Sequence, residues 1–240
     1  FPEPLEGLRD VCEQYKVKVV YDAAHVLGLI AGECFQDPLS EGADIVTGSV
    51  HKTFFGTQRG IILSNVDDNE WTKIDKGAFP GSSSNHHLDS LVGLAMACDE
   101  MLDFGREYAR QIVSNAKILG TALDKHGFKV QAKEFGYTES HQVAVDVGEH
   151  GGGKMVSEVL EKNDIILNMN LLPSESIKYV RNPNGVRIGV QEMTRFGMKE
   201  EEMERIAELM KECIVDKKYV KKEVNLFRES FQRIGFSYDK

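Results

Sequence analysis

The chain has 240 residues, of which 41% are hydrophobic and 28% are charged, a balance typical of a globular protein with a buried core. Its formal net charge of −9 argues against a nucleic-acid-binding surface, because such surfaces are basic. No apolar run approaches the roughly 18 residues of a membrane-spanning helix. The 4 cysteines are scattered without metal-site spacing, which predicts reduced thiols, no bound metal and a cytoplasmic location.

The amino-terminal part of the chain alternates between helical and strand patterns. Apolar residues at helical spacing predict an amphipathic helix over residues 4–15. Short apolar runs predict strands over 17–21, 43–50 and 61–63, with a short helix or turn at 27–31. This alternation is typical of a mainly parallel sheet, whose carboxyl ends collect the binding and catalytic residues.

A polar stretch and a long helix follow. Residues 66–87 carry no clear apolar period and predict a loop. Apolar spacing then predicts a helix from about residue 88 to residue 123, with a bend at Gly105 and a capping glycine at Gly127. We expect this helix to lead out of a first domain.

The first domain is expected over residues 1–105 and a second, α+β domain over residues 106–240. In the second domain, strands are predicted over 141–147, 165–168 and 186–190, and helices over 151–160, 203–214 and 220–234.

Two polar clusters follow predicted strands. Asp22, Ala24 and His25 come directly after the first strand, and Ser49, His51 and Lys52 end the second: the clusters read Asp-Ala-Ala-His and Ser-Val-His-Lys. A lysine amine can bond to an aldehyde cofactor, and an acid can keep a pyridine nitrogen protonated. Taken alone, each residue has a simpler structural interpretation, as a helix cap, a core histidine or a surface charge. Their order and spacing together predict an enzyme that uses pyridoxal phosphate.

The same residues resemble the serine hydroxymethyltransferase family. The Ser-Asn-His-His stretch at 84–87 and residues 191–195 resemble its archaeal-type branch more than the common bacterial one. The resemblance extends from about residue 1 to about residue 215. It is carried in order by residues 21–31, residues 43–53, Arg59-Gly60, Phe79-Pro80-Gly81, residues 185–189 and Thr194-Arg195.

The resemblance implies a role for each residue around the cofactor ring. Lys52 matches the lysine that forms the Schiff base with pyridoxal phosphate, and Asp22 matches the partner of the pyridine nitrogen. Ala24 matches the small residue packed against one face of the ring. His25 matches the histidine near the ring hydroxyl and the substrate carboxylate, and His51 matches the histidine before the lysine.

Other positions match the rest of the family's site. Ser49 keeps a hydroxyl where the family usually has threonine. Gly81 begins the loop that in the family reaches the cofactor phosphate of the neighbouring subunit. Arg187 matches the arginine that clamps the substrate carboxylate, and Arg59 matches a further active-site arginine.

The resemblance further implies a fold-type-I pyridoxal phosphate transferase that acts as a homodimer. Its reaction would move the hydroxymethyl carbon of serine to tetrahydrofolate or a modified tetrahydropterin, leaving glycine. The match covers the carboxyl-terminal part of the family's chain, so we expect a fragment. The missing part would carry the first strands, a stacking aromatic residue, the main phosphate loop and a catalytic glutamate.

Two alternatives stay open at this point. One is another fold-type-I enzyme, such as a threonine aldolase, which needs no pterin. The other is a non-catalytic module that forms dimers and binds pyridoxal phosphate weakly or not at all.

Overall fold

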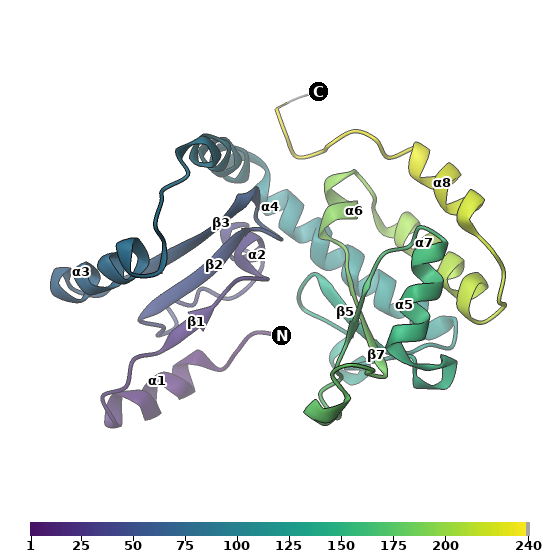
Figure 1. Ribbon diagram of the computed structural model, residues 1–240, viewed down its shortest axis with the longest axis horizontal. Coiled ribbons are helices and arrows are strands. Elements are labelled where there is room, and N and C mark those ends of the chain that lie inside the picture. Colours follow the sequence, from purple (N-terminus) through teal and green to yellow (C-terminus); the bar gives the residue numbers. More distant parts are fainter. Residues whose placement is uncertain (239–240) are drawn as a thin grey trace. The chain divides into compact units, whose positions relative to one another are not determined.

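The computed structural model describes residues 1–238. The chain forms two compact units, residues 1–109 and the residues from 110 onward, and the boundary falls inside helix α4 (Leu88–Lys125; Figure 1). Among the described residues, no helix combines the length and the apolar character needed to cross a membrane.

The first unit is built on a three-stranded sheet in the order β1-β2-β3. Its strands are β1 (Val20–Asp22), β2 (Ile45–His51) and β3 (Phe55–Ser64). β1 and β2 run parallel, whereas β2 and β3 are antiparallel. The connection between β2 and β3, residues 52–54, is too short for the crossover that a parallel neighbour requires. The mainly parallel sheet that we predicted therefore has an antiparallel strand at one edge here.

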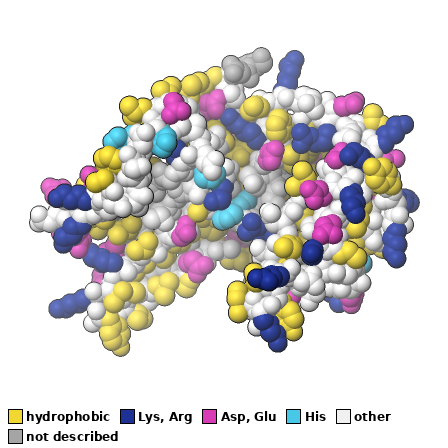
Figure 2. Space-filling model, viewed as in Figure 1, with side chains coloured by type: hydrophobic (Ala, Val, Ile, Leu, Met, Phe, Trp, Pro, Cys, Tyr) yellow, Lys and Arg dark blue, Asp and Glu magenta, His cyan; other side chains and the backbone are white. Residues whose placement is uncertain are grey.

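Helices α1 (Leu5–Gln14) and α2 (Leu27–Ala31) form where the sequence predicts them. The apolar stripe of α1 is largely exposed, however: Leu5 is buried, whereas Leu8, Val11 and Tyr15 are not. Figure 2 shows hydrophobic side chains gathered over this helix. The amphipathic pattern thus predicts the helix correctly, and this part of the first unit presents apolar surface.

The predicted loop at 66–87 was wrong in its first half, where helix α3 (Asp68–Lys76) forms. The Asp67 side chain caps this helix by accepting hydrogen bonds from the backbone N–H groups of Asn69 and Glu70. Acidic residues in its first turn and lysines in its last suit the helix dipole. None of its residues is buried, so it shows no apolar period. An irregular turn, Gly77–Ser82, follows it, and Phe79 and Pro80 in this turn have non-helical backbone angles.

Close helix packing in the first unit depends on small residues. A Cβ atom on Gly32, at the end of α2, would lie 2.4 Å from the backbone oxygen of Gly105 in α4. Gly105, where we predicted a bend, lies within one continuous helix, α4. Its oxygen and the Gly32 backbone approach each other closely because neither residue has a side chain in the way.

The second unit has an antiparallel sheet in the order β4-β5-β7-β6, as the α+β pattern predicts. Its strands are β4 (Lys129–Val130), β5 (Gln142–Asp146), β6 (Asn168–Asn170) and β7 (Gly185–Gly189). Its helices, besides the end of α4, are α5 (Gly152–Lys162), α6 (Gln191–Arg195), α7 (Glu200–Ile214) and α8 (Lys221–Glu229).

Two boundaries in the second unit differ from the prediction. The strand predicted at 165–168 begins only at Asn168, because the Ile165 N–H bonds to Leu160 at the end of α5 and holds the chain out of the sheet. Helix α8 ends at Glu229, and the Gly235 N–H then bonds to the Arg195 oxygen of α6. Both chain segments leave the regular pattern where a backbone donor finds a partner in another element.

The predicted capping glycine after α4 is confirmed. Gly127 has a φ of +87°, and the Phe128 N–H bonds back to the oxygen of Leu123. This left-handed turn after a helix is the conformation that favours glycine.

Candidate functional site

Asp22 and Ser49 project from the same face of the first unit's sheet, near the carboxyl ends of β1 and β2. Asp22 is the last residue of β1 and lies opposite Thr47. Along β2, Val46, Gly48 and Val50 are buried, and the alternating residues Thr47 and Ser49 are less so. Because side chains alternate along a strand, Asp22, Thr47 and Ser49 share the less buried face.

The Lys52 amine is held at this end of the sheet by a hydroxyl group. Its Nζ donates a hydrogen bond of 2.9 Å to Ser49 Oγ. The register of β2 against β3 shifts between Ser49 and His51, which marks a β-bulge just before the lysine. Such a bulge re-aims the residues that follow it. The half-buried lysine and the strand-borne serine therefore form one local pair.

The Asp22 carboxylate is fixed from its own loop. Its Oδ1 accepts a 2.9 Å hydrogen bond from the Ala24 N–H, and the Ala23 N–H continues the pairing with β2 by bonding to Thr47. Within residues 1–238, no hydrogen bond reaches Oδ2 of Asp22. One carboxylate oxygen thus orients the side chain, and the other is left to accept from a further donor.

Thr53, which the sequence analysis did not single out, joins the two clusters. Its hydroxyl donates to the backbone oxygen of His25 at 2.8 Å and accepts from the Gly28 N–H at 3.0 Å. The residue follows Lys52 directly and is fully buried. The only sequence signal for it was its place beside the lysine.

His51 and Arg59 lie on the hairpin formed by β2 and β3. The ring Nδ1 of His51 is 3.3 Å from the backbone oxygen of Arg59. The Arg59 guanidinium donates to the backbone oxygens of His86 and His87 and to the Ser90 hydroxyl, at 2.7–2.8 Å. These bonds tie β3 to the start of α4. The predicted contact of Arg59 with substrate stays a prediction.

Gly81 lies in the exposed turn that precedes α4. A Cβ atom there would lie 2.8 Å from the backbone oxygen of Lys76, so the tight turn leaves no room for a side chain. The hydroxyls of Ser82 and Ser83 both donate to the Ala78 oxygen within the same turn. The predicted role of Gly81 in binding the cofactor phosphate stays a prediction.

Arg187 belongs to the second unit, on the interior strand β7. It lies opposite Ala144 of β5 and Asn168 of β6 and is half-buried. No other described residue makes a hydrogen bond or an ion pair with its guanidinium. A half-buried guanidinium in this state can bind a carboxylate through two parallel hydrogen bonds.

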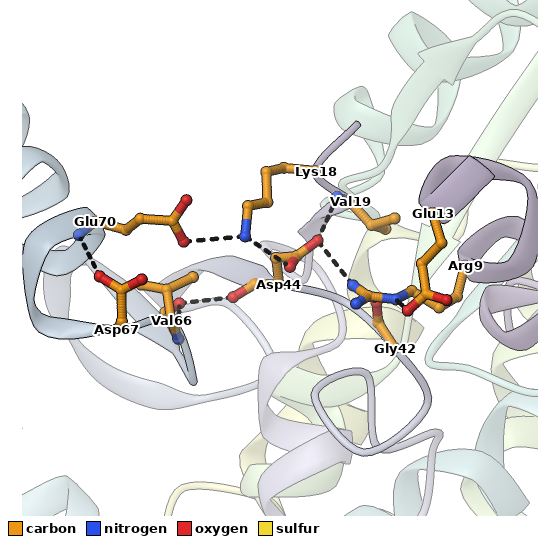
Figure 3. Close-up of polar contacts among 10 residues, drawn as sticks. Arg9, Glu13, Lys18, Val19, Gly42, Asp44, Val66, Asp67 and Glu70 are labelled. Carbon is orange, nitrogen blue, oxygen red and sulfur yellow. Dashed lines mark hydrogen bonds and ion pairs between the residues drawn. The ribbon is translucent and has the colours of Figure 1, made fainter. Parts of the chain in front are cut away.

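A second polar cluster, also missed from the sequence, lies at the opposite end of β2 (Figure 3). Asp44 accepts from the Val19 N–H at 2.8 Å, and it forms ion pairs with Arg9 and Lys18 at 3.1 and 3.3 Å. Burial raises the pKa of Asp44, but these three donors outweigh it, and the net pKa lies below its ordinary value. Lys18 also pairs with Glu70 of α3. Each charged group in this cluster is therefore paired with a group of opposite charge.

The sequence of the chain is similar to those of known proteins. A family model described as "Serine hydroxymethyltransferase" matches residues 5–210. Curated proteins of that name are similar over the whole chain: the one from Archaeoglobus fulgidus is 53% identical, and the one from Pyrococcus horikoshii is 51% identical. The chain spans 55% and 58% of their respective lengths. These archaeal relatives agree with the archaeal-type resemblance.

A solved structure is similar as well. The crystal structure of L-threonine transaldolase from Pseudomonas fluorescens, in an internal aldimine state, has a TM-score of 0.91 and 34% sequence identity. The match covers 99% of this chain and 54% of that one. It confirms the predicted fold class, a fold-type-I α/β architecture. The chain therefore belongs to the serine hydroxymethyltransferase family.

Proposed function

We propose that this chain supplies part of the active site of a serine hydroxymethyltransferase. The enzyme would use pyridoxal phosphate to convert serine and a tetrahydropterin, either tetrahydrofolate or a modified form, reversibly to glycine and the methylene-pterin. One observation carries the proposal: Asp22 and the Lys52–Ser49 pair lie toward the same end of neighbouring parallel strands. Open α/β sheets bind their ligands at this end.

The residues at this end suit the cofactor. When bound, pyridoxal phosphate supplies an electron-withdrawing ring that stabilises negative charge on the substrate's α-carbon. The unbonded oxygen of Asp22 would hold the proton on the ring nitrogen through a charge-assisted hydrogen bond. Ala24, with its small side chain, would pack against a ring face, and His25 would lie near the ring hydroxyl.

The amine of Lys52 would be the point of covalent attachment. An amine attacks only when it has lost its proton, and the Ser49 hydroxyl at 2.9 Å orients it. His51 directly precedes Lys52 in the sequence and His25 lies in the loop after Asp22, and imidazole groups hold and move protons near neutral pH. We assign proton handling at the substrate to these two histidines.

Three further residues have proposed roles in substrate binding and in assembly of the dimer. Arg187 would bind the serine carboxylate with its guanidinium, which has no charged partner among the described residues. Arg59 would contribute to substrate binding, and Gly81 to the phosphate site of a neighbouring subunit in a homodimer. The protein would act in one-carbon metabolism in the cytoplasm.

The attachment point can be tested by spectroscopy on the full-length gene product. Lys52→Ala should abolish the visible absorbance of covalently attached cofactor. Lys73→Ala is the matched control, because Lys73 lies exposed in α3. An unchanged spectrum in Lys52→Ala would sink the assignment.

A second candidate function is favoured by the similarity to the L-threonine transaldolase. An aldolase-type enzyme would cleave a β-hydroxy amino acid without a pterin. Assays on serine and on allo-threonine, each with and without tetrahydropterin, separate the two. Serine turnover at the full rate without pterin would favour the second function.

The other alternative, a non-catalytic module, can be tested by titrating the 240-residue chain itself with pyridoxal phosphate. A non-catalytic module predicts no spectral change.

A further inference from the structure

One buried side chain links the turn that carries Lys52 to the loop that carries Asp22. Thr53 has no exposed surface, and its hydroxyl makes two hydrogen bonds, to the His25 oxygen at 2.8 Å and from the Gly28 N–H at 3.0 Å. The hydroxyl is thus both donor and acceptor, to groups at the start of α2. A threonine hydroxyl used in this way fixes the two segments in one geometry.

The backbones of the two segments also touch at Gly28. A Cβ atom on Gly28 would lie 2.2 Å from the carbonyl carbon and oxygen of Thr53, and 2.5 Å from the Phe54 nitrogen. No side chain fits in that space, so glycine allows the first turn of α2 to rest directly on the turn after Lys52. The hydrogen bonds of Thr53 therefore lie inside a tight backbone contact.

This link lies beyond the end of the strand pairing. The ladder between β1 and β2 stops at Asp22 and Thr47, with one more hydrogen bond from the Ala23 N–H. Lys52 lies five residues past Thr47, after the bulge. Strand pairing alone thus does not set the position of the lysine relative to the acid, and the Thr53 link supplies a second constraint.

We propose that Thr53 is a positioning residue that holds the Lys52 amine in register with the Asp22 carboxylate. The inference rests on the proposed function and adds to it a residue outside the family-matched assignments above. Because Thr53 is fully buried, it acts through Lys52 and His25, without contact to a ligand. Removing its hydroxyl would leave the Gly28 N–H and the His25 oxygen each short of one buried partner.

The test compares three variants of the full-length gene product. Thr53→Val removes the hydroxyl and keeps the shape, Thr53→Ser keeps the hydroxyl, and Thr72→Val is the control. Thr72 lies exposed in α3, where its hydroxyl bonds to the Asp68 oxygen. Thr53→Val should weaken cofactor binding about tenfold, the scale of one hydrogen bond, and Thr53→Ser should recover most of it.

A further readout separates positioning from stability. In the fully loaded protein, Thr53→Val should move the pH midpoint of the cofactor's visible absorbance, whereas Thr53→Ser and Thr72→Val should leave it in place. A wild-type midpoint in loaded Thr53→Val would overturn the inference. A wild-type protein without Lys52-attached cofactor would instead overturn the proposed function, and the inference with it.

A measurement on the wild type covers the case in which Thr53→Val does not fold. Loading the cofactor onto Lys52 should slow hydrogen exchange at the Gly28 amide, because Thr53 transmits the ordering of the turn to that N–H. Unchanged exchange at Gly28 on loading would overturn the inference.

Discussion

The two ends of the parallel strand pair β1 and β2 carry similar groups in opposite states. At the amino end, Asp44 accepts from three donors, and its partners Arg9 and Lys18 each bond to a further carboxylate. At the carboxyl end, within the part of the chain that the structure describes, Asp22 has one donor and the Lys52 amine has one acceptor. Groups whose hydrogen-bonding capacity is filled within the fold contribute to stability. Groups with capacity left over are the ones that can bind a ligand.

The sharpest way to test this contrast is to neutralise the acid at each end in turn. Asp22→Asn in the full-length gene product should lower kcat/KM by about 10²–10³-fold, because an amide cannot hold the ring nitrogen's proton. Its thermal unfolding should stay close to that of the wild type, since among residues 1–238 the Ala24 N–H alone loses a charged acceptor. Steady-state kinetics and calorimetry check both points. A large loss of stability with normal kinetics would reverse the roles of the two ends.

A smaller loss of enzyme function is expected from a substitution in the second unit. Arg187→Lys should raise KM for serine by about 10–100-fold, because an ammonium cannot make the paired hydrogen bonds of a guanidinium. Arg181→Lys is the matched control, since Arg181 is an exposed residue shortly before β7. Equal KM values for the two variants would remove Arg187 from the substrate site.

The smallest effect is expected at the amino end of β2. Asp44→Asn should lower the free energy of unfolding by about 1–2 kcal/mol, because the amide still accepts from Val19 while its ion pairs with half-exposed partners are lost. Catalytic constants should not change. Chemical denaturation at pH 7 measures the difference.

The pH dependence of that difference follows from the pKa of Asp44. The folded-state pKa is lowered, so the carboxylate stabilises the fold above its unfolded pKa of about 3.9, and this contribution is lost as the pH falls toward the folded value. The gap between wild type and Asp44→Asn should therefore close below about pH 4. A gap that persists at lower pH would show that the charge is not what stabilises this end.

The sequence predicted the carboxyl end of the sheet better than the amino end. Asp22 and Lys52 follow apolar runs of strand type, so their place at strand ends could be inferred from local pattern alone. The partners of Asp44 lie 25 to 35 residues earlier in the sequence, from Val19 back to Arg9. No local sequence pattern predicts contacts over such separations.

The role of Thr53 and the presence of helix α3 were not predicted from the sequence, for related reasons. The partners of Thr53 are 28 and 25 residues away in the sequence, so its role appears only once α2 is packed on the turn. Helix α3 buries no residue, and it therefore lacks the apolar period by which helices are recognised. Its capping residue, Asp67, was the available signal.

The most direct test of the contrast is to trap the cofactor and locate its attachment. The full-length gene product, loaded with pyridoxal phosphate and reduced with borohydride, should carry the reduced cofactor on Lys52, as read by peptide mass spectrometry. The lysine at the other end of the sheet, Lys18, is already paired with Asp44 and Glu70 and should remain unmodified. Attachment at Lys18 or at any lysine other than Lys52 would contradict the account.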